Sequence, residues 1–392
     1  MTIAGKIETF ISRSSWIRKM FEEGTRLKQQ HGSDNVFDFS LGNPYLQPPD
    51  KFRTVLQDLL RNAGPCDHSY MPNTGYPAVC KKVADYLVTE QGVPISGSEI
   101  IMTCGAAGGL NVILKTLLNP NEEVVTPAPY FVEYGFYADN HGGKLVTVPT
   151  NSDFTLDLQK IESAITGKTR MVLINSPNNP TGQIYSKKSL EQLGSMLRQK
   201  SKELNRTIYL VSDEPYRKIV YDGIDVPSLF PCYDDSIIVT SFSKDISIPG
   251  ERIGFVAVNP KAEYKKDLIA GMALANRILG FVNAPALMQR AVGELQGESA
   301  DMRLYAKKRN LLCDSLSDFG YQFEKPAGAF YLFCKSPIPD DVRFVKILQE
   351  ELILTVPGSG FGGPGYFRIA FCVDDDTIIK ALPGFKRAIQ KV

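Results

Sequence analysis

The sequence has almost no excess charge and few histidines. Its 44 lysines and arginines nearly balance its 43 aspartates and glutamates, which argues against nucleic acid or an anionic membrane as the main partner. The three histidines, His31, His68 and His141, are far apart, and no two cysteines have C-x-x-C spacing. We therefore predict no metal site.

Long apolar runs are also missing. No segment approaches the roughly 20 consecutive apolar residues that a membrane-spanning helix needs. The N-terminus carries charges at Lys6, Glu8 and Arg13 and lacks the continuous apolar core of a secretion signal. The 7 cysteines are odd in number and scattered, as is typical of reduced thiols. Together these absences predict a cytoplasmic protein without a membrane partner.

What the sequence does contain is an apolar fraction of 43% over 392 residues, enough for well-buried cores in two domains. A helix is predicted over Ser15–Gln30, and a long helical region from Ala262 to about Leu295. Between them, short β-rich runs alternate with helical stretches, which predicts a mostly parallel sheet covered by helices. The runs are Glu99–Thr103, Glu123–Thr126, Lys144–Val148, Arg170–Asn175, Ile208–Ser212, Ile237–Thr240 and Arg252–Val258.

The C-terminal part has a different pattern. A helix is predicted at Met302–Leu316, followed by strands at Ala329–Cys334 and Tyr366–Cys372. We therefore predict an α/β protein in three parts: an N-terminal segment over residues 1–45, a large domain over 46–290 and a small α+β domain over 291–392.

Chemically capable side chains follow several predicted strands, where open parallel sheets bind their ligands. The small residues Gly105–Gly109 could cradle an anion before a helix that starts near Leu110, or only allow close packing. Asn179 lies in a rigid turn, and Asp213 could hold a protonated ring nitrogen or cap a helix. Lys244, directly after the run Ile237–Ser243, could form a Schiff base with a carbonyl cofactor.

Taken together, these motifs resemble the class I/II aminotransferases of fold type I, the aspartate-aminotransferase-like superfamily. The cofactor-lysine signature of that family is similar to the run Ser241–Gly254, SFSKDISIPGERIG. Asn179-Pro180-Thr181-Gly182, Asp213 with Tyr216, and Arg368 follow in the family's order, so the resemblance covers essentially the whole chain. It implies a pyridoxal-5′-phosphate-dependent enzyme that moves an amino group from an L-amino acid to a 2-oxo acid by a ping-pong mechanism.

The resemblance also implies a role for each matching residue. Lys244 would form the Schiff base and move the proton, Asp213 would pair with the ring nitrogen, and Tyr216 and Asn179 would bond the phenolic oxygen. Tyr130 would stack on the ring. The residues implied to hold the phosphate are Gly105, Ala106, Ala107, Ser241, Ser243 and Arg252, with Tyr70 from the neighbouring subunit of a homodimer. The residues implied to contact substrate are Arg368, at its α-carboxylate, Asn179, Gly42 and Asn43.

The substrate and the reaction type stay open at this point. The phosphate loop has Ala106 and Ala107 where many family members carry a hydroxyl. A cation for a second substrate carboxylate is not evident, although Arg18, Lys28 and Arg277 are candidates. The same scaffold also supports β-elimination by a C–S lyase, because the cofactor supplies the chemistry. A dinucleotide-dependent dehydrogenase is disfavoured, since the G-x-G-x-x-G fingerprint is missing.

Overall fold

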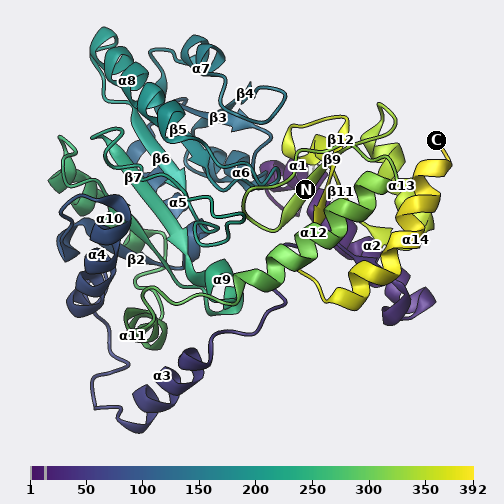
Figure 1. Cartoon of the computed structure of the whole chain (residues 1–392). Coiled ribbons are helices and arrows are strands. Elements are labelled where there is room, and N and C mark those ends of the chain that lie inside the picture. The colour runs from purple at the N-terminus through teal and green to yellow at the C-terminus, as the bar shows by residue number, and fades with distance from the viewer. Residues whose placement is uncertain (1, 13–15) are drawn as a thin grey trace.

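A seven-stranded sheet forms the centre of the larger part of the molecule (Figure 1). The computed structural model describes residues 2–12 and 16–392. The strands of this sheet are β2 (Ile100–Thr103), β3 (Glu123–Ala128), β4 (Lys144–Pro149), β5 (Thr169–Asn175), β6 (Tyr209–Asp213), β7 (Ser236–Ser241) and β8 (Gly254–Val258). They lie in the order β2-β8-β7-β6-β5-β3-β4, and only β8 runs antiparallel to its neighbours. The predicted α/β fold with a mostly parallel sheet is confirmed.

Alternate residues of the central strands point to opposite faces of this sheet. Along β5, Met171 and Leu173 pack into one hydrophobic core, whereas Val172 and Ile174 pack into the other. One face is covered by α4 (Pro77–Gln91), α7 (Leu158–Ala164), α8 (Lys187–Glu203) and α11 (Ala286–Glu294). The other face is covered by α5 (Gly105–Leu117), α6 (Glu133–Asn140) and α10 (Lys265–Ile278). This double cover explains why the strands are continuously apolar in sequence.

A smaller antiparallel sheet lies beside the large one (Figure 1). Its strands are β9 (Tyr331–Lys335), β11 (Val356–Pro357) and β12 (Tyr366–Ala370). It shares a separate core with α12 (Met302–Asp318), α13 (Asp341–Glu350) and α14 (Asp375–Gln390). Met20 of α2 (Trp16–His31) packs into this core, and β1 (Phe37–Asp38) pairs with β10 (Ile353–Leu354). The N-terminal segment is thereby attached to the C-terminal part of the chain. The domain boundaries at 45 and 290 stay a prediction.

Some helix boundaries differ from the prediction. The long helical region is two helices, α10 and α11, because Gly280 adopts a left-handed φ of 87° and Pro285 precedes the second helix. Helix α5 begins at Gly105, so the small residues form its first turn instead of a preceding loop. The prediction did not include α1 (Gly5–Ser12), α3 (Asp50–Arg61), α4 or α7. Ser15, where the first helix was predicted to begin, lies outside the described residues.

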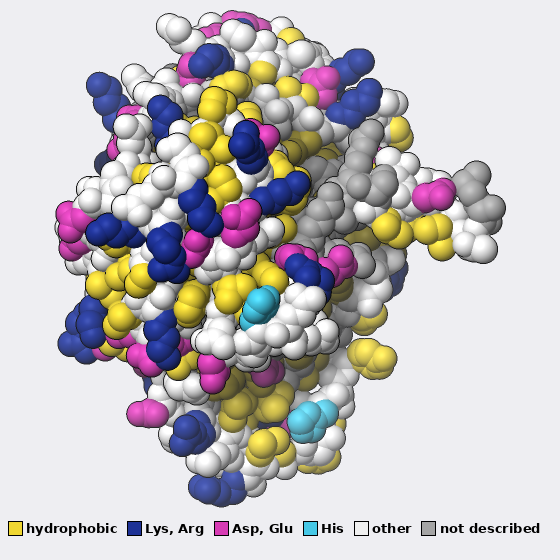
Figure 2. Space-filling view, turned by 90° about the vertical axis from the view of Figure 1, so that its right-hand side faces the viewer, with side chains coloured by type: hydrophobic (Ala, Val, Ile, Leu, Met, Phe, Trp, Pro, Cys, Tyr) yellow, Lys and Arg dark blue, Asp and Glu magenta, His cyan; other side chains and the backbone are white. Residues whose placement is uncertain are grey.

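The surface agrees with the balanced composition. On the face shown in Figure 2, basic and acidic side chains are intermingled, and neither sign gathers into a continuous area. Within residues 2–12 and 16–392, no helix is both long and apolar enough to cross a membrane. The cysteines are all unpaired, and five are buried: Cys80, Cys232, Cys313, Cys334 and Cys372.

Candidate active site

A cavity of about 260 Å³ lies where the carboxyl ends of β5, β6 and β7 meet the smaller sheet. Parallel strands bring residues that are distant in sequence to one edge, which explains how the separate motifs meet here. The side chains and backbone that line it belong to Gly42, Ala106, Ala107, Leu110, Phe131, Asn175, Asn179, Asp213, Pro215, Tyr216, Ser241, Ser243, Lys244, Pro249, Arg252, Tyr331 and Arg368. Most of the residues singled out from the sequence are therefore in one place.

Lys244 lies in the short helix α9 (Phe242–Asp245), directly after β7. Its Nζ donates a hydrogen bond of 2.7 Å to the backbone oxygen of Gly42 and makes no ion pair with a carboxylate in the described part of the chain. Burial, helped by the positive charges of Arg252 and Arg368, lowers the pKa of Lys244 to about 8. A buried amine with this pKa is partly neutral near pH 8, and the neutral form is the nucleophile.

Asp213 is the last residue of β6, and its side chain is fully buried in the cavity wall. Tyr134 of α6 donates a hydrogen bond of 2.6 Å to Oδ2, whereas Oδ1 is buried and has no partner. Asn175 Nδ2 donates to the backbone oxygen of Asp213 at 2.7 Å. Burial raises the pKa of Asp213 to about 7, and the charge of Glu214 adds to this effect. The unpartnered Oδ1 could accept a hydrogen bond from a protonated nitrogen of a ligand, and that positive charge would favour the ionised form of Asp213.

Several residues that line the cavity form a candidate anion cradle. Ala106 and Ala107 are in the first turn of α5, where backbone N–H groups have no partner within the helix and the dipole favours negative charge. The Ser241 and Ser243 hydroxyls lie 2.6 Å apart, and the Arg252 guanidinium lines the same cavity. These donors and this cation fit a phosphate group.

Arg368 of β12 is almost fully buried but has no carboxylate partner among the described residues. Its Nη1 donates to Asn179 Oδ1 at 3.0 Å, its Nη2 donates to the Ser40 backbone oxygen at 2.5 Å, and its Nε has no partner. The guanidinium carbon lies 4.6 Å from the ring centres of Tyr331 and Phe361. A buried cation held only by neutral groups is suited to bind a carboxylate ligand.

Several residues that line or support the cavity were not found from the sequence. Tyr331 of β9 shares a hydrogen bond of 2.8 Å with the hydroxyl of Tyr216. Tyr134 orients Asp213, and Phe131 lines the cavity. The sequence carries no signal for these aromatics, which resemble ordinary core residues. Asn175 could have been found, because it ends a predicted strand in the same way as Asp213.

Four of the residues predicted from the sequence do not line the cavity. Tyr130 is turned toward Gly362, so its neighbour Phe131 takes the position beside the cavity that was expected for Tyr130. Gly105 lies behind the lining residues, next to the Arg252 guanidinium. Asn43 is exposed. Tyr70 is 90% exposed, and its expected role concerns a neighbouring subunit.

Comparison with known proteins decides the family. The model of the family "Aminotransferase class I and II" matches residues 34–384. This chain belongs to that family. The aminotransferase is 30% identical to aromatic-amino-acid aminotransferase 2 of Thermococcus litoralis, over 100% of this chain and 99% of the relative. It is 31% identical to the aspartate/prephenate aminotransferase of Thermus thermophilus, over 89% of each chain. A solved aminotransferase from Eubacterium rectale has the same fold, with a TM-score of 0.96 and 37% identity over 100% of this chain and 99% of that chain.

The protein is therefore a transaminase that depends on pyridoxal phosphate. The residues of the cavity fit this cofactor. Lys244 offers a buried amine for its aldehyde, the unpartnered oxygen of Asp213 can accept a hydrogen bond from its ring nitrogen, and the first turn of α5 with Ser243 and Arg252 can hold its phosphate. Among the residues that the structure describes, Lys244 makes no ion pair with a carboxylate and Oδ1 of Asp213 has no partner, so both groups are available to the cofactor.

Proposed function

We propose that this aminotransferase moves the amino group of an L-amino acid to a 2-oxo acid in two half-reactions at one site, with Lys244 as the residue that binds the cofactor covalently. The observation that supports this most directly is the buried Lys244 amine, which shares a cavity with the unpartnered Asp213 oxygen and the carboxylate-free Arg368. The same cavity thus has a place for a carbonyl, a ring nitrogen and a carboxylate.

Pyridoxal phosphate, when bound, supplies an electron sink for the negative charge that develops at the substrate Cα. In this proposal Asp213 keeps a proton on the ring nitrogen, which strengthens that sink. Tyr216 and Asn179 would donate hydrogen bonds to the phenolic oxygen of the cofactor, and Tyr331 fixes the Tyr216 hydroxyl through a hydrogen bond of 2.8 Å. Phe131, which lines the cavity, would cover the ring in the role that the sequence suggested for Tyr130.

Substrate binding is assigned to Arg368. Its buried guanidinium keeps an unpartnered Nε for the α-carboxylate, and its hydrogen bonds to Asn179 and Ser40 hold it in place. The Lys244 amine, which lines the same cavity, is the group that would take the Cα proton as a general base. Burial lowers its pKa to about 8, which is close to neutral pH. The Gly42 backbone oxygen supplies a fixed acceptor for that amine, so the N-terminal segment closes this side of the cavity.

The covalent assignment is tested by reducing the enzyme with borohydride in the presence of the cofactor and mapping its peptides by mass. The cofactor mass is expected on the peptide that contains Lys244, and Lys244→Ala should carry no label. A label on a different residue, or none on folded wild-type protein, would refute the proposal. This readout does not depend on activity.

The reaction type is tested with a panel of aromatic, branched-chain, dicarboxylic and small amino donors against 2-oxoglutarate and pyruvate. Transamination requires the acceptor and gives a new amino acid in equal amount. Release of ammonia and pyruvate from a cysteine-type donor without an acceptor would instead identify a C–S lyase. The same panel identifies the substrate pair.

A further inference from the structure

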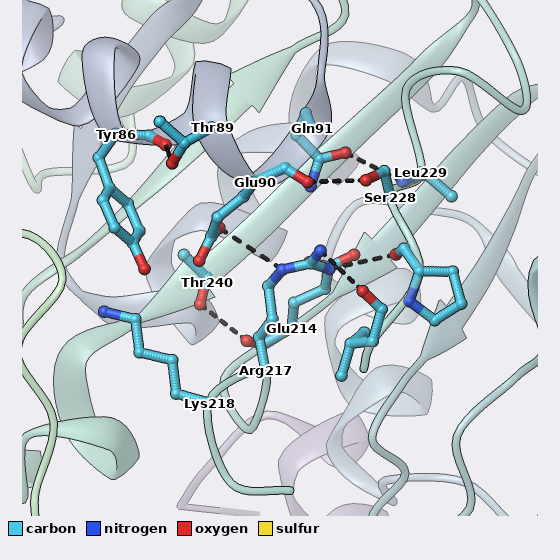
Figure 3. A network of polar contacts seen from close by, with 12 residues as sticks. Tyr86, Thr89, Glu90, Gln91, Glu214, Arg217, Lys218, Ser228, Leu229 and Thr240 are labelled. Atoms are coloured by element: carbon cyan, nitrogen blue, oxygen red, sulfur yellow. Dashed lines mark hydrogen bonds and ion pairs between the residues drawn. The ribbon is translucent and has the colours of Figure 1, made fainter. Parts of the chain in front are cut away.

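A second, smaller pocket of about 30 Å³ lies behind the active site and contains buried charges (Figure 3). It opens on the face of the large sheet that α4 covers, since it is lined by Leu87 and Ile238 of that core. The active-site cavity is lined by Leu110 of the opposite core. Pro215 and Ser241 contact both spaces, so only the chain at the ends of β6 and β7 separates them.

Five charged side chains meet in this pocket. Arg217 pairs with Glu214 at 2.9 Å and with Glu90 at 3.4 Å, and Lys218 pairs with Asp245 at 3.5 Å. The side chains are only 4–18% exposed. Figure 3 shows Arg217 between the two glutamates, with Lys218 turned toward the Tyr86 ring. Burial at this depth is costly for charged groups unless they are paired, as they are here.

The positions of these residues in the sequence connect the pocket to catalysis. Glu214 directly follows Asp213, and Asp245 directly follows Lys244, so each active-site residue has an acidic neighbour that points into the second pocket. The two cations that bind these neighbours are themselves adjacent, Arg217 and Lys218. One dipeptide therefore holds the two chain segments that carry the active-site carboxylate and amine.

Backbone contacts transmit this hold to the active site. The Glu214 N–H donates to the Val239 oxygen at 2.8 Å, and the Thr240 hydroxyl donates to the Glu214 oxygen at 2.9 Å. These bonds join the end of β6 to the end of β7. Lys218 also donates to the Glu298 backbone oxygen at 3.2 Å, and Ala300 N–H donates to the Asp245 oxygen at 2.7 Å.

We propose that Arg217 and Lys218 are positioning residues of the transamination site, which fix the Asp213 carboxylate and the Lys244 amine through Glu214 and Asp245. This inference rests on the proposed function. Neither cation lines the active-site cavity, so both act through their neighbours.

Electrostatics gives Arg217 a second effect in the same direction. Burial is the main cause of the raised pKa of Asp213, and the negative charge of Glu214 raises it further. Burial also raises the pKa of Glu214, and the positive charge of Arg217 lowers it. The other charged and titratable groups that face Glu214 and Asp245 are Glu90 and Tyr86 of α4 and Lys218. Loss of Arg217 removes the positive charge that favours the ionised form of Glu214, and so changes the charge one residue from Asp213.

The experiment compares holoenzymes of Arg217→Met, Lys218→Met and the control Arg206→Met. Arg206 is a matched control because it is partly buried, pairs with Glu122 and donates to the Gly167 backbone oxygen at the amino ends of the strands, away from the cavity. Three quantities are measured: kcat, KM, and the pH midpoint of the absorbance change of the bound cofactor.

Arg217→Met is expected to lower kcat about tenfold or more, because small displacements of reacting groups have effects of this size. KM should change less than about threefold, since Arg217 does not contact substrate, and the pH midpoint should move by at least about 0.5 unit. Lys218→Met should act in the same way. Arg206→Met should lower the melting temperature but leave kcat and the midpoint unchanged.

Glu214→Gln combined with Arg217→Met removes both members of the buried ion pair and should return the midpoint toward that of the wild type. If Arg217→Met fails to fold, this double variant and the separate single variant Lys218→Met still test the inference. The inference is overturned if Arg217→Met and Lys218→Met keep wild-type kcat and midpoint, or if Arg206→Met changes both equally. If the wild type is labelled at Lys244 and transaminates, such a result contradicts only the positioning role. If the wild type is not labelled, the proposed function itself fails.

Discussion

At the scale of single residues, the active site contains two buried ionisable groups, Asp213 and Lys244, and burial disfavours the charged form of each. The pKa of Asp213 is raised to about 7 and that of Lys244 is lowered to about 8, in both cases mainly by burial. Strong shifts of this kind in a cavity are typical of functional groups and reduce the stability of the empty protein. Each shift leads to a measurement.

The first prediction concerns the rate at which the apoenzyme binds pyridoxal phosphate covalently. The neutral Lys244 amine is the reactive form, so the rate should rise with pH, with a midpoint near 8, and then level off. Stopped-flow absorbance measures this rate. A midpoint close to 10.5, the ordinary value for lysine, would show that Lys244 is not desolvated in solution.

The second prediction concerns the stability of the apoenzyme. Because the folded-state pKa of Asp213 is raised above its ordinary 3.8 to about 7, its contribution to stability is complete below pH 3.8 and is lost as pH rises through about 7. Asp213→Asn does not titrate and keeps an acceptor for Tyr134. Relative to wild type, the variant should therefore gain stability between pH 4 and pH 8, on the order of 3 kcal/mol.

Urea unfolding of both apoproteins at the two pH values measures this difference. A difference that does not depend on pH would contradict the assignment. Because the cofactor returns a partner to Asp213, the wild type should regain stability when it is loaded, and Asp213→Asn should regain less.

At the scale of elements, the anion cradle depends on close contact between β8, β7 and the start of α5. Gly254, the first residue of β8, faces the Thr240 backbone oxygen and lies next to the Gly105 backbone. A Cβ atom at this position would overlap the Thr240 oxygen and come within 3.0 Å of Gly105. Both neighbours are backbone, which cannot move away as a side chain can.

The third prediction is that Gly254→Ala separates α5 from β7 and weakens both the fold and the cradle. We expect a loss of about 1–3 kcal/mol in unfolding free energy, the range typical of overpacking. The Kd for pyridoxal phosphate, measured by fluorescence titration, should rise at least tenfold. Gly280→Ala is the control, because it makes the same substitution at a position where nothing lies within 4 Å of the added Cβ. It should reduce stability through its positive φ and leave Kd unchanged.

At the scale of the whole molecule, the cavity exists only because three parts of the chain meet. Arg368 belongs to the smaller sheet, Asn179 to the larger part, and Ser40 to the N-terminal segment, and the first donates to the other two. This arrangement agrees with the proposed division into a segment over 1–45 and domains over 46–290 and 291–392, and with closure of the site between them. A neighbouring subunit is a further proposed contributor.

The fourth prediction tests that contribution through Tyr70, which is 90% exposed in the single chain. If its hydroxyl reaches the phosphate in the partner subunit of a homodimer, Tyr70→Phe should raise the Kd for pyridoxal phosphate about tenfold, the loss expected for a hydrogen bond to a charged group. Tyr264→Phe is a control, because Tyr264 is also an exposed tyrosine. Sedimentation should show a dimer; an unchanged Kd, or a monomer that is fully active, would contradict the proposal.

The sequence alone determined the local features of this protein. Short apolar runs predicted the strands, and the residues after them, Asn179, Asp213 and Lys244, were expected at one edge because parallel strands end together. The run Ser241–Gly254 identified the family before any geometry was known. These inferences hold because strand alternation and strand ends are set by residues close together in the chain.

The tertiary structure decided what depends on distant neighbours. Phe131 lines the cavity, whereas the Tyr130 ring lies against Gly362, more than two hundred residues later in the chain. Tyr331 meets Tyr216, and Lys218 meets Asp245, only after the sheets pack. A side chain's direction within a packed core results from contacts that the local sequence does not encode, so the supporting residues of the site became visible only in three dimensions.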